Sequence, residues 1–183
     1  AAMNKRVHTR LALEQDLRRA LAKGELVVHY QPVVALQGGA VLAHEALVPW
    51  QHPARGLVPP GDFLQLAEDT GLVIGLGEWV LREACRWATF IGTERGVQVS
   101  VNLSLRQFND PKLIELVRRV LAESGLPPHL LMLEVAETTA MHQTDVAAST
   151  LAKLKEQGVA LAIDDFGTGY SNLASLRRFP VDV

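Results

Sequence analysis

The sequence predicts an α/β fold built around a largely parallel sheet. Short apolar segments with the character of strands alternate with longer amphipathic segments that have the period of helices. Hydrophobic residues make up 48% of the 183 residues, which is enough for one domain with a substantial core. This alternation is typical of either a doubly wound sheet or a barrel.

The first part of the chain predicts a helix followed by a hairpin. Leucines spaced among charged residues indicate an amphipathic helix that ends near Gly24, and two apolar runs flank the turn Gly38-Gly39. The expected elements are a helix over 11–21 and strands over 26–36 and 41–50. Residues 1–10 are expected to be a cloning remnant or a linker, so the domain is placed at 11–183.

After the hairpin, strands and helices are expected to alternate. Pro59-Pro60 and Asp110-Pro111 precede two of the helical patterns, and Gly125 and Gly158 follow two others. The expected helices cover 62–68, 78–90, 112–124 and 145–157, and the expected strands cover 97–103, 130–135 and 159–163.

Composition argues against several classes of protein. The formal net charge of -2 argues against a protein that binds nucleic acid polymers through their phosphates. No apolar run reaches the roughly 18 residues of a membrane span, and the start lacks the apolar core of a signal peptide. Cys85 is the only cysteine, which excludes an internal disulfide and suits a reducing cytosol. We therefore expect a cytoplasmic domain, whether or not the parent protein is tethered to a membrane.

The most informative motif is the run Asp164-Asp165-Phe166-Gly167-Thr168, which follows an apolar strand. Adjacent strand residues point to opposite faces, so Asp164 can face a central metal while Asp165 reaches sideways. Asp-Phe-Gly is also the metal-binding triplet of protein kinases, but the glycine-rich loop, strand lysine and His-Arg-Asp loop of kinases are missing here. An Asp pair that only opens a turn is the alternative.

Polar side chains also mark the carboxyl ends of the other predicted strands. Asn102, Glu134 and Asp164 recur at intervals of about 30 residues, the length of one strand–helix unit. In a barrel these ends meet at one mouth, together with Glu45 from the second strand. Each residue alone is equally compatible with a surface charge or a turn. As a group, carboxylates at one mouth repel unless a cation neutralises them.

The ligand chemistry narrows the kind of metal. Oxygen donors suit Mg²⁺, Mn²⁺ or Ca²⁺ rather than zinc. With Asp165 nearby a second ion can bind, and a pair of metal ions is well suited to hydrolysis of a phosphodiester.

In its motifs and their order, the sequence resembles the EAL domain family, the cyclic di-GMP phosphodiesterases of bacterial signalling. The resemblance runs from about Leu11 to Val183 with every motif in order. The motifs are Tyr30-Gln31-Pro32, Glu45-Ala46-Leu47, Trp50, His52-Pro53, Pro60, Phe63, Ala67-Glu68, Val101-Asn102-Leu103-Ser104, Leu133-Glu134-Val135 and residues 164–171.

The resemblance implies a TIM-type barrel with an antiparallel first strand, of which about five of eight strands lie in this sequence. It implies Mg²⁺ or Mn²⁺ held by Glu45, Asn102, Glu134 and Asp164, with Asp165 at a second metal. Glu137 would brace the loop from Asp165 to Ser171, and Gln31 and Leu47 would contact the nucleotide. Glu45, Asp164, Asp165 and Glu137 are then the expected catalytic residues. A metal-activated water would open cyclic di-GMP to linear pGpG.

The sequence departs from the family pattern in three ways. Pro49 stands where the family usually has an arginine that contacts phosphate, and proline offers no donor. Ala136 and Asn172 replace a common threonine and a common serine. The family's catalytic lysine and later strands would follow Val183, so we expect either a longer native protein or a second chain that completes the barrel. A homodimer and a preceding regulatory domain are further expectations.

These departures keep two other functions open. One is a receptor that binds cyclic di-GMP without turnover, and the other is a docking module that binds a protein and no nucleotide.

Overall fold

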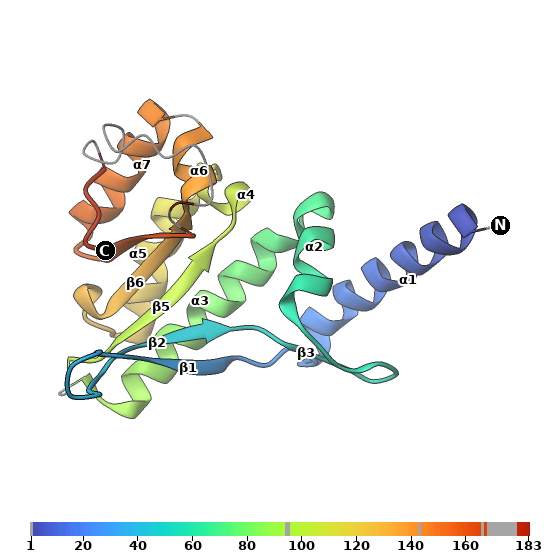
Figure 1. Ribbon diagram of the computed structural model, residues 1–183, viewed down its shortest axis with the longest axis horizontal. Coiled ribbons are helices and arrows are strands. Elements are labelled where there is room, and N and C mark those ends of the chain that lie inside the picture. The colour runs from blue at the N-terminus through green and yellow to red at the C-terminus, as the bar shows by residue number, and fades with distance from the viewer. Residues whose placement is uncertain (1, 94–95, 143, 166, 168–178) are drawn as a thin grey trace.

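The computed structural model describes residues 2–93, 96–142, 144–165, 167 and 179–183 (Figure 1). In chain order the elements are α1 (Ala2–Lys23), β1 (His29–Val34), β2 (Val41–Leu47), β3 (Trp50–His52), β4 (Gly56–Val58), η1 (Pro60–Asp62), α2 (Leu64–Thr70), α3 (Leu72–Ile91), β5 (Gln98–Leu103), α4 (Leu105–Phe108), α5 (Leu113–Ser124), η3 (Pro128–Leu130), β6 (Leu131–Ala136), α6 (Glu137–His142), α7 (Thr144–Glu156) and β7 (Ala160–Asp164).

The main sheet is mixed, and within the described residues it has five strands in the order β1-β2-β5-β6-β7. Strands β2, β5, β6 and β7 are parallel, and β1 is antiparallel to β2. The α/β class and the antiparallel first strand are therefore confirmed. Over the described residues the sheet does not close into a barrel, since β1 and β7 stand at opposite ends of the strand order.

The free side of β7 is lined by the end of the chain. The backbone N–H of Asp182 donates to the carbonyl oxygen of Leu161 at 2.8 Å, and the N–H of Ile163 donates to that of Val183 at 3.0 Å. Asp182 and Val183 therefore form hydrogen bonds with the free edge of β7 without forming a further strand.

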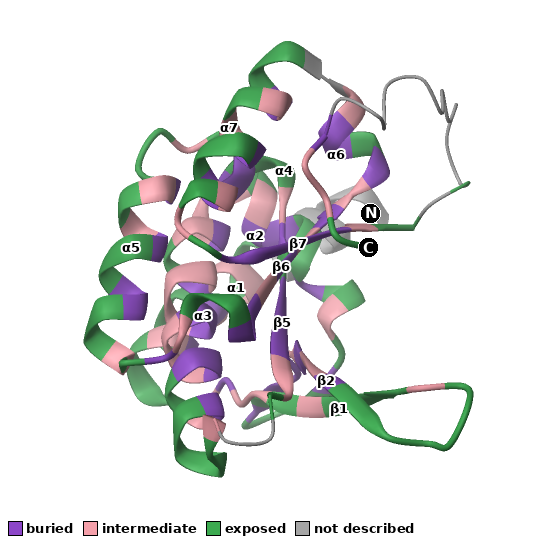
Figure 2. Cartoon of the chain, turned by 90° about the vertical axis from the view of Figure 1, so that its left-hand side faces the viewer, coloured by how far each residue is buried: buried purple, intermediate pink, exposed green. Residues whose placement is uncertain are grey.

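Helices cover one face of the sheet, and the opposite face, which no layer of helices covers among the described residues, is called the open face. Helices α3, α5 and α7 lie together on one side, as Figure 2 shows. The strand residues that face them are apolar and buried, among them Val101, Leu133 and Leu161. Because side chains alternate along a strand, the intervening residues point to the opposite face.

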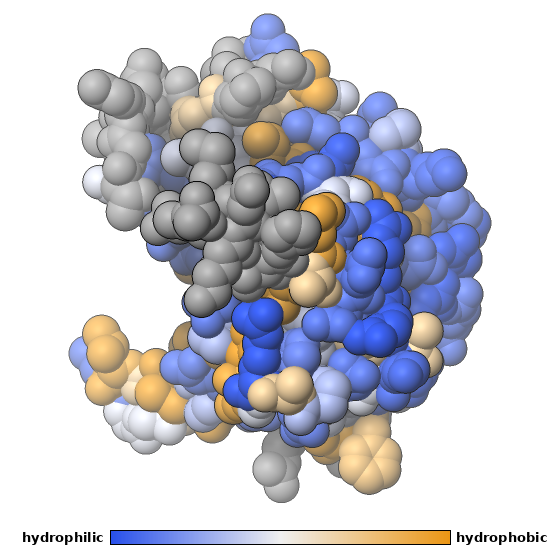
Figure 3. Space-filling model, turned by 90° about the vertical axis from the view of Figure 1, so that its right-hand side faces the viewer, coloured by the Kyte–Doolittle hydropathy of each residue, from blue (hydrophilic) through white to orange (hydrophobic). Residues whose placement is uncertain are grey.

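The hairpin of β1 and β2 projects from the molecule and exposes apolar side chains at its far end (Figure 3). Leu36 is fully exposed, and Val34 and Leu42 are about half exposed at 50% and 54%.

The predicted strand over 41–50 is wrong at its end. Strand β2 stops at Leu47, and Trp50 instead begins β3, which pairs with β4 in a separate two-stranded sheet. Pro49 lacks an N–H group for the ladder, which interrupts the strand. The predicted strand over 26–36 is too long, because β1 covers only His29–Val34. Leu26 pairs instead with Trp50 in an isolated bridge.

Helix α3 is longer than predicted, because it begins at Leu72 and not at Glu78. Gly75 and Gly77 lower the local helix propensity, but the apolar face around them is buried and outweighs it. The short helices α4 and α6 were not predicted. Glu137, the residue expected to brace the loop after Asp165, is the first residue of α6.

Helix α1 confirms the predicted helix over 11–21 and begins before it, at Ala2. Its second half packs on the domain through Leu17 and Ala20, both fully buried. His52 on β3 contacts Asp16 at 3.2 Å between Nε2 and Oδ2. None of the helices in the described part of the chain has the length and apolar character needed to cross a membrane.

Candidate metal-binding site

Strand register brings the predicted polar residues to the open face of the sheet. Asn102 on β5 lies directly beside Glu134 on β6. Glu45 on β2 pairs with Gln31 on β1 and with Ser100 on β5, which is two residues before Asn102. Because residues two apart share a face, all of these side chains leave the sheet on the same side.

Asp164 joins this set from β7. It lies two residues after Ala162, which pairs with Glu134, so it points to the same face at the carboxyl end of the strand. Glu45, Asn102, Glu134 and Asp164 therefore leave the sheet on one face, and their role as metal ligands stays a prediction.

Two of these residues are already in contact. The Nδ2 group of Asn102 donates a hydrogen bond to Oε1 of Glu45 at 2.7 Å. The amide oxygen of Asn102 and the second oxygen of Glu45 are left available as ligands.

The electrostatics of Glu134 show that the carboxylates influence one another. Burial raises the pKa of Glu134 above its ordinary value, and the negative charges of Glu45 and Asp164 raise that pKa further. The neighbouring Ser100 hydroxyl acts in the opposite direction and stabilises the ionised form. A half-buried carboxylate under repulsion from two others is a site that a cation stabilises.

The donors fit a hard divalent cation in kind. They are carboxylate and amide oxygens, which Mg²⁺ and Mn²⁺ prefer. Over the part of the chain that the structure describes, no group of three His, Cys, Asp or Glu side chains is close enough to form a ready metal site. The fourth oxygen donor, beside Glu45, Glu134 and Asp164, would be the side-chain amide of Asn102.

The Asp pair sits on an unusual piece of backbone. Asp165 has a φ of 55°, the only positive φ of a non-glycine residue among those described. Its N–H donates to Oδ1 of Asp164 at 2.8 Å. This left-handed conformation turns the chain immediately after β7, and such backbone strain is common at functional sites. Phe166 and residues 168–178, Asn172 included, lie outside the described residues.

Glu137 is tied to this turn. Its side chain is almost fully buried at 1% exposure, and its Oε2 accepts a hydrogen bond from the N–H of Gly167 at 2.8 Å. The contact links α6 to the segment after the Asp pair, and the bracing role expected of Glu137 stays a prediction. The contacts expected beyond Gly167 lie outside the described residues.

The two residues expected to touch a nucleotide lie at the edge of the same region. Gln31 is exposed on β1 in register with Glu45. Leu47 lines a cavity of about 100 Å³ that Asn102 and Gln107 also line. Pro49 is buried, and its carbonyl oxygen accepts a hydrogen bond from the N–H of Val27 at 3.3 Å.

Sequence reasoning missed Ser100 and Gln107. Ser100 is fully buried beside the carboxylates. Its spacing of two residues from Asn102 on the same strand is the signal that could have found it. Gln107 forms a capping box with Ser104, since each side chain bonds the backbone N–H of the other. The spacing Ser-x-x-Gln is the sequence signature of that cap.

The fold and the site together define a class: an α/β domain with acidic residues on one face at the carboxyl ends of parallel strands, where α/β enzymes carry their active sites. The family model for the EAL domain matches residues 14–183. The chain belongs to the EAL domain family.

Known proteins are similar in sequence to nearly the whole of this chain. The bifunctional diguanylate cyclase/cyclic di-GMP phosphodiesterase MucR of Pseudomonas aeruginosa is 46% identical over 184 residues, which cover 98% of this chain and 27% of MucR. The cyclic di-GMP phosphodiesterase NbdA of the same organism is 45% identical over 175 residues, which cover 94% of this chain and 22% of NbdA. The chain therefore spans about a quarter of the length of these relatives.

A solved structure of the MucR phosphodiesterase in complex with c-di-GMP has the same fold. It superposes with a TM-score of 0.90 at 46% identity, covering 93% of this chain and 70% of that one.

Proposed function

We propose that this chain is a phosphodiesterase domain that hydrolyses cyclic di-GMP to linear pGpG with Mg²⁺ or Mn²⁺. The observation that carries the proposal is the placement of Glu45, Asn102, Glu134 and Asp164 on one open face at the carboxyl ends of four neighbouring parallel strands. Family membership and the c-di-GMP complex of the MucR phosphodiesterase support it.

Each residue has a proposed role. Glu45, Asn102, Glu134 and Asp164 hold one cation, and Asp165 reaches a second. When bound, such cations neutralise phosphate charge and activate a water for attack on phosphorus. Gln31 and Leu47 orient the nucleotide, and Glu137 keeps the turn after Asp165 in place through Gly167.

Because the site is acidic, binding of the substrate should depend on binding of the metal. An acidic face repels the two phosphodiester anions of cyclic di-GMP. Binding of substrate is therefore expected to weaken strongly when the metal is removed with EDTA.

A receptor that binds without turnover is the second candidate. Pro49 favours it, because a buried proline replaces an arginine that contacts phosphate in the family.

In the full-length protein we place this domain in the cytosol and downstream of a regulatory domain, in keeping with the greater length of MucR and NbdA. We also propose that two copies associate. Size-exclusion chromatography with light scattering tests this, and a monomer with and without nucleotide would contradict it.

The test of the proposed activity is to incubate the chain with cyclic di-GMP and Mg²⁺ or Mn²⁺ and to resolve the products by chromatography. We expect linear pGpG. Intact nucleotide that is bound, measured by calorimetry, would select the receptor, and neither binding nor turnover would overturn the proposal.

Asp164→Asn separates catalysis from folding. We expect turnover to fall by at least about 100-fold, because even residues behind the metal ligands contribute about 10- to 100-fold. The thermal midpoint should change little, since Asp164 is exposed. Glu156→Gln is the control: it removes a carboxylate from the end of α7, before β7 begins, and should leave turnover unchanged. If Asp164→Asn unfolds the chain, Asp164 is structural.

A further inference from the structure

Ser100 carries a buried hydroxyl that the proposed mechanism does not use. The residue lies in the middle of β5 and is 0% exposed. Among the described residues its Oγ makes no hydrogen bond of normal geometry. A buried hydroxyl without a partner costs free energy, so its retention calls for an explanation.

The surroundings of Ser100 point to one acceptor. Ser100 pairs with Glu45 on one side and with Met132 on the other, and Glu134 is the next residue of β6 on the same face. The hydrogen bond from Nδ2 of Asn102 to Oε1 of Glu45 directs the Glu45 carboxylate toward Asn102, two residues beyond Ser100. Glu134 is partly buried and leaves the sheet on the same face as Ser100, two residues after Met132, the partner of Ser100 in the register.

We propose that Ser100 is a positioning residue, whose hydroxyl donates a hydrogen bond to the Glu134 carboxylate and holds it in the orientation that binds the cation. The inference rests on the proposed function, because it concerns the same metal site. With one oxygen of Glu134 accepting from Ser100, the remaining lone pairs are left for the cation. Such support behind a metal ligand raises metal affinity by fixing the ligand in advance.

The test is the Mn²⁺ affinity of the chain without nucleotide, measured by isothermal titration calorimetry. We expect Ser100→Ala to weaken Mn²⁺ binding by about tenfold, the usual effect of losing a partner of a metal ligand. Ser100→Thr keeps the hydroxyl and should restore most of the affinity.

Val101→Ala is the matched control. It truncates the next residue of β5 on the covered face, so it should lower the thermal midpoint and leave Mn²⁺ affinity unchanged. Should the alanine variant of Ser100 fail to fold, Ser100→Cys keeps nearly the same size with a weak donor and gives the same comparison.

The outcomes distinguish the two proposals. If the wild-type chain binds neither Mn²⁺ nor Mg²⁺, the proposed function fails. If it binds Mn²⁺ and Ser100→Ala binds equally well, the metal site stands and the role of Ser100 is overturned.

Discussion

At the residue scale, strand alternation decides which neighbours act together. Tyr30 and Gln31 are adjacent, yet Tyr30 stacks on Trp87 of α3 with ring centroids 3.7 Å apart, while Gln31 lies on the open face beside Glu45. The sequence motif Tyr-Gln-Pro therefore combines an anchor to the helix layer with a residue of the candidate site.

Pro49 is the residue where the site departs most from its family. Pro49→Arg is expected to tighten cyclic di-GMP binding by about tenfold, because a charge-assisted hydrogen bond to phosphate contributes roughly 1.5–3 kcal/mol. Calorimetry on the two variants Pro49→Arg and Pro49→Ala measures this. The alanine variant should match the wild type, since it removes proline without adding a donor. Unchanged affinity in the arginine variant would contradict the role given to Pro49.

At the element scale, a glycine in α3 makes room for the cap of α4. A Cβ atom added to Gly77 would lie 1.7 Å from Nε2 of Gln107, the residue that closes the capping box after Asn102. The same junction is held by Arg106, which donates a hydrogen bond to the carbonyl oxygen of Glu68 at the end of α2.

Gly77→Ala is therefore expected to destabilise the chain by about 1 kcal/mol, because displacing the Gln107 amide breaks its capping hydrogen bond with Ser104. Denaturant unfolding measures the loss. Gly75→Ala is the control in the same helix: nothing lies within 4 Å of its added Cβ, so it should stabilise by about 0.5–1 kcal/mol. The pair Gly77→Ala and Gln107→Ala should be coupled, because removing the amide relieves the clash. Strict additivity would show that this contact is not the cause.

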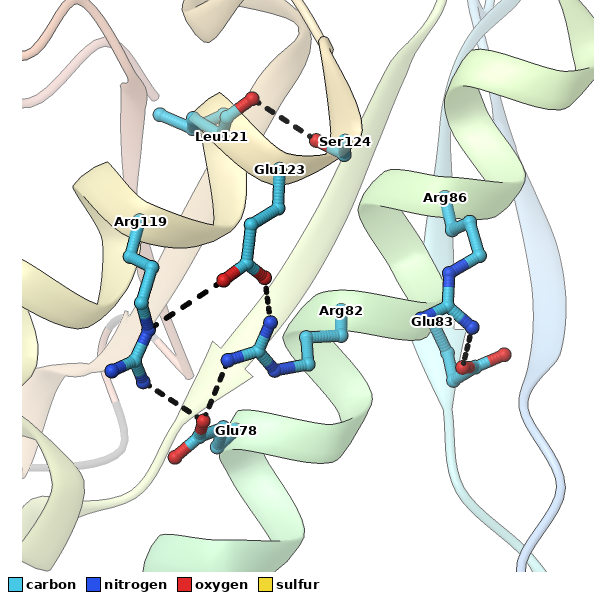
Figure 4. Close-up of polar contacts among 8 residues, drawn as sticks. All are labelled: Glu78, Arg82, Glu83, Arg86, Arg119, Leu121, Glu123 and Ser124. Carbon is cyan, nitrogen blue, oxygen red and sulfur yellow. Dashed lines mark hydrogen bonds and ion pairs between the residues drawn. The ribbon is translucent and has the colours of Figure 1, made fainter.

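Four charged residues join α3 to α5 (Figure 4). Oε1 of Glu78 accepts from Arg82 at 2.8 Å and from Arg119 at 2.9 Å, and Glu123 pairs with both arginines. Each residue has two partners, so the geometry of the network is held more tightly than that of an isolated surface pair.

Glu78→Gln should lower the free energy of unfolding by about 1 kcal/mol at low salt, and most of this loss should vanish at 1 M NaCl. Urea unfolding at both salt concentrations measures it. Glu83→Gln breaks a single exposed pair with Arg86 and should cost at most about 0.5 kcal/mol. Equal losses in the two variants would mean that the network adds nothing to its separate pairs.

At the scale of the whole molecule, burial decides the response to alkali. Burial raises the pKa of the Cys85 thiol from 9.0 to about 12. Burial, with the charges of Glu83 and Cys85, raises the pKa of Tyr30 from 10.0 to about 12. The folded chain holds both protons more tightly than the unfolded chain, so protonation of these two groups stabilises the folded state.

This contribution is complete below about pH 9 and is lost as the pH rises toward 12. The thermal midpoint should therefore fall from pH 9 upward, with a shallower fall in the double variant Cys85→Ala and Tyr30→Phe. The slopes, not the midpoints, are compared, since Cys85→Ala also leaves a small cavity. Identical slopes in the two proteins would rule out these groups as the cause.

The amino-acid sequence by itself determined the α/β class, most of the elements and the family. It also determined that Asn102, Glu134 and Asp164 recur at intervals of about 30 residues and that Glu45 lies near the end of the second strand, because period and spacing are local properties of a chain.

Contacts between distant segments were decided only by the tertiary structure. Examples are the pairing of Trp50 with β4, the hydrogen bond from the N–H of Gly167 to Glu137, and the burial of Ser100 beside Glu134. They depend on strand register and on how helices pack against the sheet, which the local pattern of residues does not encode.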